Sequence, residues 1–178
     1  RIKSFRVLSR GSSLAIPCLE HAKSFHDLGL LAEAQNYYRR IYTDHEEREE
    51  GVEALFRYGL LCLEQAKALH PEKEQEASDS LLDEAWKHFD KVENSFFAPL
   101  GVLGKAMAHA QRGETEKEID ELLRAFGQYA DYDTLPVISE RLLTRLYIWA
   151  FEGVNTASDR LRVGIEKVLQ TFDPSSSN

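Results

Sequence analysis

Hydrophobic residues recur along this chain at the three- and four-residue steps of an α-helix. One series comprises Leu55, Gly59, Cys62, Ala66 and Leu69, and similar series run through residues 82–96 and 161–172. Each series forms one apolar stripe along a helix, and this stripe must pack against a neighbouring helix. The pattern predicts about eight helices, over residues 13–27, 30–44, 46–69, 78–95, 99–112, 115–130, 135–152 and 156–172. Only residues 2–8 suit a strand, and they suit the end of a preceding helix equally well.

Residues that begin and end helices fall between these segments. Gly29, Gly113 and Gly153 are placed to end helices, because glycine enters the left-handed conformation without strain. Pro99 suits the first turn of a helix, where its missing N–H costs nothing. Thr115 and Glu118 have the spacing of a capping box, in which hydroxyl and carboxylate satisfy free N–H groups. The short connections predict antiparallel neighbours.

The stretch around Gly29 resembles a tetratricopeptide repeat, a helix-turn-helix unit of about 34 residues. The residues that carry the resemblance are Ala22, Phe25, Gly29, Leu31, Ala34, Tyr38 and Ile41. In this arrangement Gly29 makes the turn and Ala34 lets the second helix approach the first. Tyr38 then fills the gap one turn further on.

Weaker copies of the pattern follow. The second is interrupted by a polar stretch over residues 70–77, the third has Glu118 at the close-contact alanine position, and the fourth keeps little beyond Trp149 and Gly153. The resemblance covers residues 13–172 and implies an all-α, right-handed α-solenoid of antiparallel helix pairs. Its predicted repeats are 13–45, 46–96, 97–131 and 132–172, with 1–12 a tail or the end of a preceding helix and 173–178 a disordered linker.

The resemblance also implies a function, because such arrays bind peptides or helices in a concave groove lined by the first helix of each pair. The positions expected in the groove are Leu19, Lys23, Phe56, Leu60, Leu63, Leu103, Met107 and Tyr147. The set is mostly apolar, which favours a peptide or an amphipathic helix of a protein partner. Carboxylate-gripping members of the family use several cationic and amide side chains, and of the matching positions only Lys23 and Arg57 are cationic here.

Two alternatives to partner binding stay open. The groove could be filled by another part of the chain or by a second copy, which would make this a structural spacer, a self-association module or a homodimer. A helical enzyme with a dispersed site is a third class, although no motif supports it. Both ends of the chain suggest a segment of a larger multidomain protein, such as the regulatory region of a signalling enzyme.

Composition and charge narrow the function further. The net charge of −8 disfavours nucleic acid as the main partner. Cys18 and Cys62 lie in apolar helical runs, which suggests buried thiols and a reducing cytoplasmic location. No apolar run approaches the roughly 20 residues that span a bilayer. His109 lies on an apolar face and suits a hydrogen-bonded core histidine, so we expect no catalytic residue, cofactor or metal.

Overall fold

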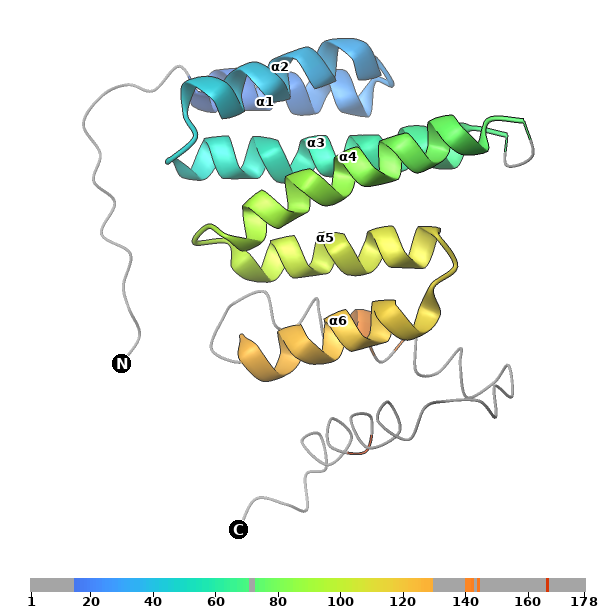
Figure 1. The fold of residues 1–178 in the computed structure, drawn as a ribbon. Coiled ribbons are helices and arrows are strands. Elements are labelled where there is room, and N and C mark those ends of the chain that lie inside the picture. The colour runs from blue at the N-terminus through green and yellow to red at the C-terminus, as the bar shows by residue number, and fades with distance from the viewer. Residues whose placement is uncertain (1–14, 71–72, 130–139, 143, 145–165, 167–178) are drawn as a thin grey trace, which may run out of the picture. The chain divides into compact units, whose positions relative to one another are not determined.

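A computed structural model describes residues 15–70, 73–129, 140–142, 144 and 166 of the chain. Its helices are α1 (Ala15–Asp27), α2 (Leu31–Asp44), α3 (Glu49–Ala68), α4 (Gln75–Glu93), α5 (Ala98–Gln111) and α6 (Thr115–Gln128) (Figure 1). The six helices predicted before residue 131 are therefore confirmed, with ends that differ by at most three residues. Within these described ranges no residue is in a strand. The two helices predicted after residue 134 fall almost entirely outside them.

The chain divides into two compact units, Arg1–Ala54 and Leu55–Asn178. In the first unit, α1 and α2 form a hairpin. Gly29 makes the turn with a φ of +73°, and its N–H donates to the carbonyl of His26 at 2.9 Å. Ala34 and Tyr38 are fully buried. The roles predicted for Gly29, Ala34 and Tyr38 are thus confirmed.

In the second unit, α4 packs against α5, and its side chains also contact α3, which it crosses in front of in Figure 1. The fully buried ring of Phe89 on α4 makes this contact. It lies against two glycines: a Cβ placed on Gly59 of α3 would be 2.5 Å from the ring, and one on Gly104 of α5 would be 2.2 Å from it. A large side chain on one helix therefore fills the space that two missing side chains leave on the others.

A second group of core residues joins α5 to α6. Its members are all almost fully buried: Val102, Leu103, Ala106, Ile119, Leu122, Ala125 and Leu142. The residues of α6 in this set recur at steps of three, so one stripe of the helix faces α5. Among the described helices, none is both long and apolar enough to cross a bilayer.

The helix ends confirm two predictions and correct a third. Gly113 follows α5 with a φ of +72°, and Pro99 lies in the first turn of α5. The capping box at Thr115 is wrong, because Thr115 is the first residue of α6 and the preceding N-cap residue, Glu114, makes no side-chain cap hydrogen bond. Glu118 is instead fully buried, and its carboxylate lies 2.8 Å from the guanidinium of Arg141. The Glu118 side chain therefore lies in the core, and the guanidinium of Arg141 compensates its negative charge.

The two cysteines differ in their burial. Cys62 is fully buried in α3, as predicted. Cys18 in α1 is partly exposed, which corrects the expectation that both thiols are core groups. Its helix has a mixed sequence, and the buried positions of α1 are Ala15, Leu19 and Ala22. Cys18 lies next to this stripe and not within it.

Candidate interaction surface

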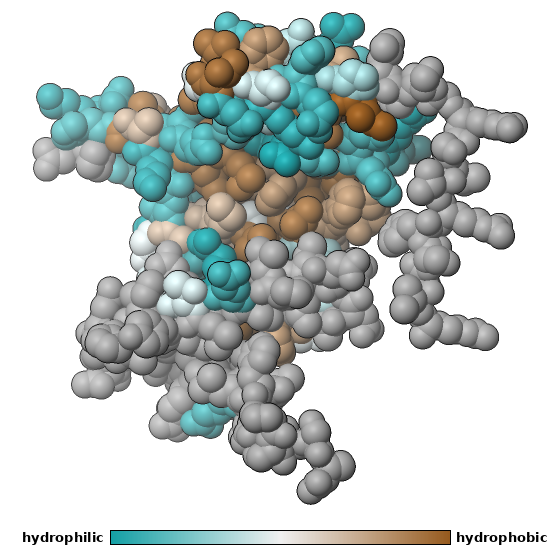
Figure 2. Space-filling view, turned by 180° about the vertical axis from the view of Figure 1, so that it is seen from behind, coloured by the Kyte–Doolittle hydropathy of each residue, from teal (hydrophilic) through white to brown (hydrophobic). Residues whose placement is uncertain are grey.

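Several apolar side chains of α3 and α5 are partly exposed. Phe56 and Leu60 are four residues apart on α3, and Leu100 and Met107 are seven apart on α5. All four side chains are partly exposed. Figure 2 shows hydrophobic side chains gathered in a band on the face opposite to the one in Figure 1. We call these four residues the α3–α5 surface.

Contacts with neighbouring side chains hold α3 and α5, the helices that carry this surface, in place. Phe56 stacks on the buried ring of Phe89, with ring centroids 5.7 Å apart. Gln111 of α5 donates from Nε2 to the carbonyl oxygen of Leu63 in α3 at 2.9 Å. Met107 and Leu100 pack against the core that joins α5 to α6. The surface therefore belongs to packed helices, and its side chains are positioned before any ligand arrives.

The predicted groove residues fall into two groups by exposure. Phe56, Leu60 and Met107 are partly exposed members of the α3–α5 surface. Leu63 and Leu103 are only 5% and 7% exposed, so their side chains mainly stabilise the core. Leu19, in the first unit, is 3% exposed and has the same role there. Tyr147 lies outside the described residues. The groove as a whole stays a prediction.

Lys23 is engaged in ion pairs within the first unit. Its ammonium lies 2.8 Å from the carboxylate of Glu20 and 2.9 Å from that of Glu53. Two acids therefore already compensate this cation. An incoming carboxylate would have to displace them.

A network of charged side chains ties α4, α5 and α6 together in the second unit. The buried Lys105 of α5 lies 2.5 Å from Asp90 and 2.8 Å from Glu93, both on α4. Arg124 of α6 approaches the same Glu93 carboxylate at 2.6 Å. The ammonium of Lys105 also lies 5.1 Å from the ring centre of Trp86. Three helices thus share one carboxylate, that of Glu93.

His109 confirms its predicted role as a satisfied core histidine. It is 9% exposed, and its Nδ1 lies 2.6 Å from the carboxylate of Glu114. Its ring also packs edge-on against Trp86, with centroids 4.8 Å apart. These contacts hold the end of α5 and the following turn in place.

The charged network should make stability depend on pH. Burial acts to raise the pKa of Glu93, but hydrogen bonds from Arg124 and Lys105 outweigh it and lower the pKa below its ordinary value of 4.5. A carboxyl group with a lowered folded-state pKa stabilises the protein fully above that ordinary value. The stabilisation is lost as the pH falls through the lowered pKa.

We therefore expect the urea midpoint to fall as the pH is lowered from about 6 to about 3. In Glu93→Gln the urea midpoint should fall less steeply, because the variant has no carboxyl group at position 93 to take up a proton. Asp79→Asn, an exposed carboxylate on the same helix, provides the control. Equal slopes for Glu93→Gln and the wild-type chain would show that the network does not set the pH dependence.

Comparison with known proteins places the chain beside one segment of much larger enzymes. No family model matches it. It is 39% identical over 115 residues to the serine/threonine-protein kinase PknD of Protochlamydia amoebophila. The matched segment covers 65% of this chain and 11% of that kinase. The kinases of the same name from Chlamydia caviae and Chlamydia felis are 33% and 34% identical over 141 and 142 residues. Those matches cover 79% of this chain and 14% of each kinase, so the chain spans only a small part of the curated relatives it matches.

Proposed function

We propose that this chain is a non-catalytic interaction segment of a larger serine/threonine protein kinase, with a tetratricopeptide-like helical arrangement. Its α3–α5 surface would bind a peptide or an amphipathic helix of a protein partner. The observation that carries the proposal is the partial exposure of four apolar side chains on α3 and α5: Phe56, Leu60, Leu100 and Met107. Apolar side chains gathered on one face commonly mark a site of association.

The chemistry of the surface favours a helix or peptide over a small polar ligand. Methionine and aromatic side chains adapt to apolar partners of varied shape. Apolar residues spaced by one turn on α3 and by two turns on α5 suit the apolar face of an amphipathic helix. An acidic chain with a net charge of −8 would favour a partner whose polar face is basic.

The comparisons support a non-catalytic role within a kinase. A protein kinase needs a glycine-rich loop over the phosphates, a catalytic-loop Asp and a metal-binding Asp in its DFG motif. None of these motifs occurs in the 178 residues. The similarity extends over 11–14% of the related kinases, a share that suits an accessory segment.

The helical arrangement in each unit supports the tetratricopeptide-like part of the proposal. The hairpin of α1 and α2 has its small residue, Ala34, at the contact between the helices. In the second unit, α4 packs on α3 and on α5 through Phe89, as the second helix of one pair would contact the first helix of the next. Such contacts leave the other face of α3 and α5 for a ligand.

A photo-reactive residue at position 60 would test partner binding in the native cell. We expect a discrete cross-linked product, while the same residue at exposed Lys87 on α4 should give none. Met107→Glu should lower the yield about tenfold or more, because losing one apolar anchor commonly costs over about 1.4 kcal/mol. Ala77→Glu, at an exposed position of α4, is the charge-matched control, and circular dichroism should show the same helical content in both variants.

The mass of the product separates the alternatives. A product of twice the chain mass, together with a dimer in sedimentation at micromolar concentration, would establish self-association. A product with a different protein, lost in Met107→Glu, would support the proposed function. Equal yields from positions 60 and 87, or a yield unchanged in Met107→Glu, would overturn it.

A further inference from the structure

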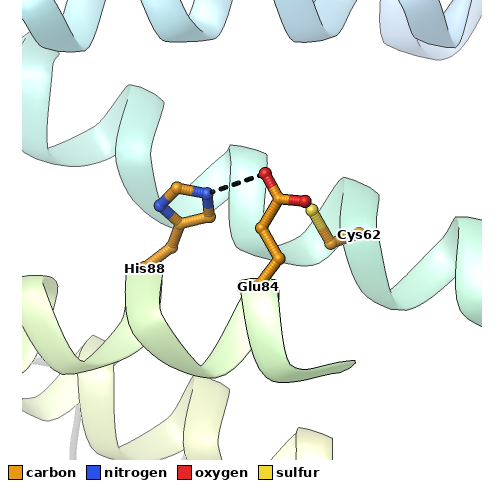
Figure 3. A group of neighbouring side chains, drawn as sticks. All are labelled: Cys62, Glu84 and His88. Atoms are coloured by element: carbon orange, nitrogen blue, oxygen red, sulfur yellow. Dashed lines mark ion pairs between the residues drawn. The ribbon is translucent and has the colours of Figure 1, made fainter. Parts of the chain in front are cut away.

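Three side chains of different chemistry come together between α3 and α4 in the second unit. They are Cys62 of α3 and Glu84 and His88 of α4 (Figure 3). One sulfur, one oxygen and one nitrogen atom from these residues all lie within 4.8 Å of one another. Figure 3 shows the Glu84 carboxylate between the imidazole of His88 and the thiol of Cys62.

The local fold explains why these groups converge. Glu84 and His88 are four residues apart and therefore share one face of α4. Cys62 belongs to the buried stripe of α3, which faces α4. The neighbouring Tyr58 stacks on His88 with ring centroids 4.4 Å apart, and its hydroxyl donates to Glu84 Oε1 at 3.0 Å. One tyrosine thus orients both α4 side chains, as outer partners of metal ligands do.

We propose that Cys62, Glu84 and His88 bind a divalent metal ion of the zinc type. Thiolate and imidazole select Zn²⁺ over Mg²⁺ and Ca²⁺, which prefer oxygen ligands alone. The thiolate and carboxylate also supply two negative charges to match the ion. Three protein ligands leave a fourth tetrahedral position for water or another donor.

The spacing of the ligands is compatible with a tetrahedral ion. Bonds of about 2.0–2.3 Å to zinc place tetrahedral ligand atoms about 3.5 Å apart. The atoms within 4.8 Å therefore need to move by only about an ångström, which side-chain rotation can supply. Binding would join α3 to α4 and would add to the stability of the unit that carries the α3–α5 surface.

A route to the ion is also present. The side chains of His88 and Glu84 are 15% and 42% exposed, whereas Cys62 is buried. Glu84 and His88 line an open surface cavity of ≈ 740 Å³, together with the polar side chains of Ser80 and Lys87. An ion could therefore reach the carboxylate of Glu84 from solvent, while the ring nitrogens of His88 and the thiol of Cys62 lie buried behind it.

Titration with Co²⁺, a spectroscopic substitute for zinc, tests the proposal on the purified 178-residue chain. We expect the visible bands of tetrahedral cobalt and a near-ultraviolet charge-transfer band from sulfur to cobalt. Cys62→Ala should abolish the charge-transfer band, and Glu84→Gln and His88→Gln should each weaken binding at least tenfold. Cys18→Ala, which removes the chain's other cysteine, should leave the spectrum unchanged.

A thermal melt provides a second readout that does not depend on colour. Excess Zn²⁺ should raise the melting temperature of the wild-type chain and of Cys18→Ala, because the ion binds the folded state. Glu84→Gln should show no such rise. If Cys62→Ala fails to fold, the partly exposed and isosteric Glu84→Gln decides the question. The absence of tetrahedral cobalt bands in the wild-type chain, or a charge-transfer band retained in Cys62→Ala, would overturn the site and leave a hydrogen-bonded cluster.

Discussion

Replacing Gly101 with alanine should lower the free energy of unfolding by about 3 kcal/mol, even though alanine is the better helix former. A Cβ at this position of α5 would lie 2.2 Å from the backbone nitrogen of Glu93 and 2.6 Å from the carbonyl oxygen of Phe89. Both atoms belong to the backbone of α4, so no side-chain rotation can relieve the overlap. The two helices would have to separate, and the contacts around Phe89 would loosen with them.

Gly127→Ala provides the matched control for this prediction. Gly127 also lies in a helix, α6, but a Cβ there would meet nothing within 4 Å. The substitution should therefore raise stability by about 0.5–1 kcal/mol through helix propensity alone. Urea unfolding followed by circular dichroism measures both variants. If Gly101→Ala were as stable as Gly127→Ala, the close approach of α4 and α5 would be wrong.

The sequence predicts the helices well because their signals are local. Gly29 and Gly113 lack a Cβ and adopt the left-handed conformation that ends a helix, which requires no knowledge of the rest of the chain. The burial of Ala34 and Tyr38 likewise follows from spacing along one helical face. Such inferences need only the period of the helix and the residues within one turn of it.

Contacts between distant segments could not be predicted in the same way. Glu118 has the right spacing from Thr115 for a cap, yet its partner Arg141 lies 23 positions further along the chain, on another segment. The local pattern predicts that the Glu118 carboxylate caps a helix, whereas in the folded chain it forms an ion pair with a distant residue. The contact of Phe89 with Gly59 and Gly104 is of the same kind, since it joins three helices.

The candidate sites show the same limit. Spacing placed Phe56, Leu60 and Met107 in one set with Leu63 and Leu103, because it could not tell partly exposed positions from those that the core covers. Sequence spacing also did not reveal the cluster of Cys62, Glu84 and His88, because Cys62 comes from another helix. The spacing of Glu84 and His88 was the one signal that could have prompted a search for a third ligand.

Removing the guanidinium of Arg141 should have an effect as large as that at Gly101. Glu118 is fully buried, and the guanidinium lies 2.8 Å from its carboxylate. In Arg141→Met the carboxylate would stay in the core without this compensating charge. Breaking a buried ion pair on one side typically costs about 3–5 kcal/mol, and we expect the lower end because Arg141 is 30% exposed.

A double-mutant cycle distinguishes this charge effect from a simple loss of packing. Glu118→Leu combined with Arg141→Met replaces the pair by apolar groups and should come within about 1 kcal/mol of the wild-type chain. Urea unfolding of both single variants and of the double variant gives the coupling energy. If the double variant were as unstable as the sum of the two single variants, the two side chains would not interact. Recovery of stability would mean that Arg141 offsets the charge of Glu118 in the core.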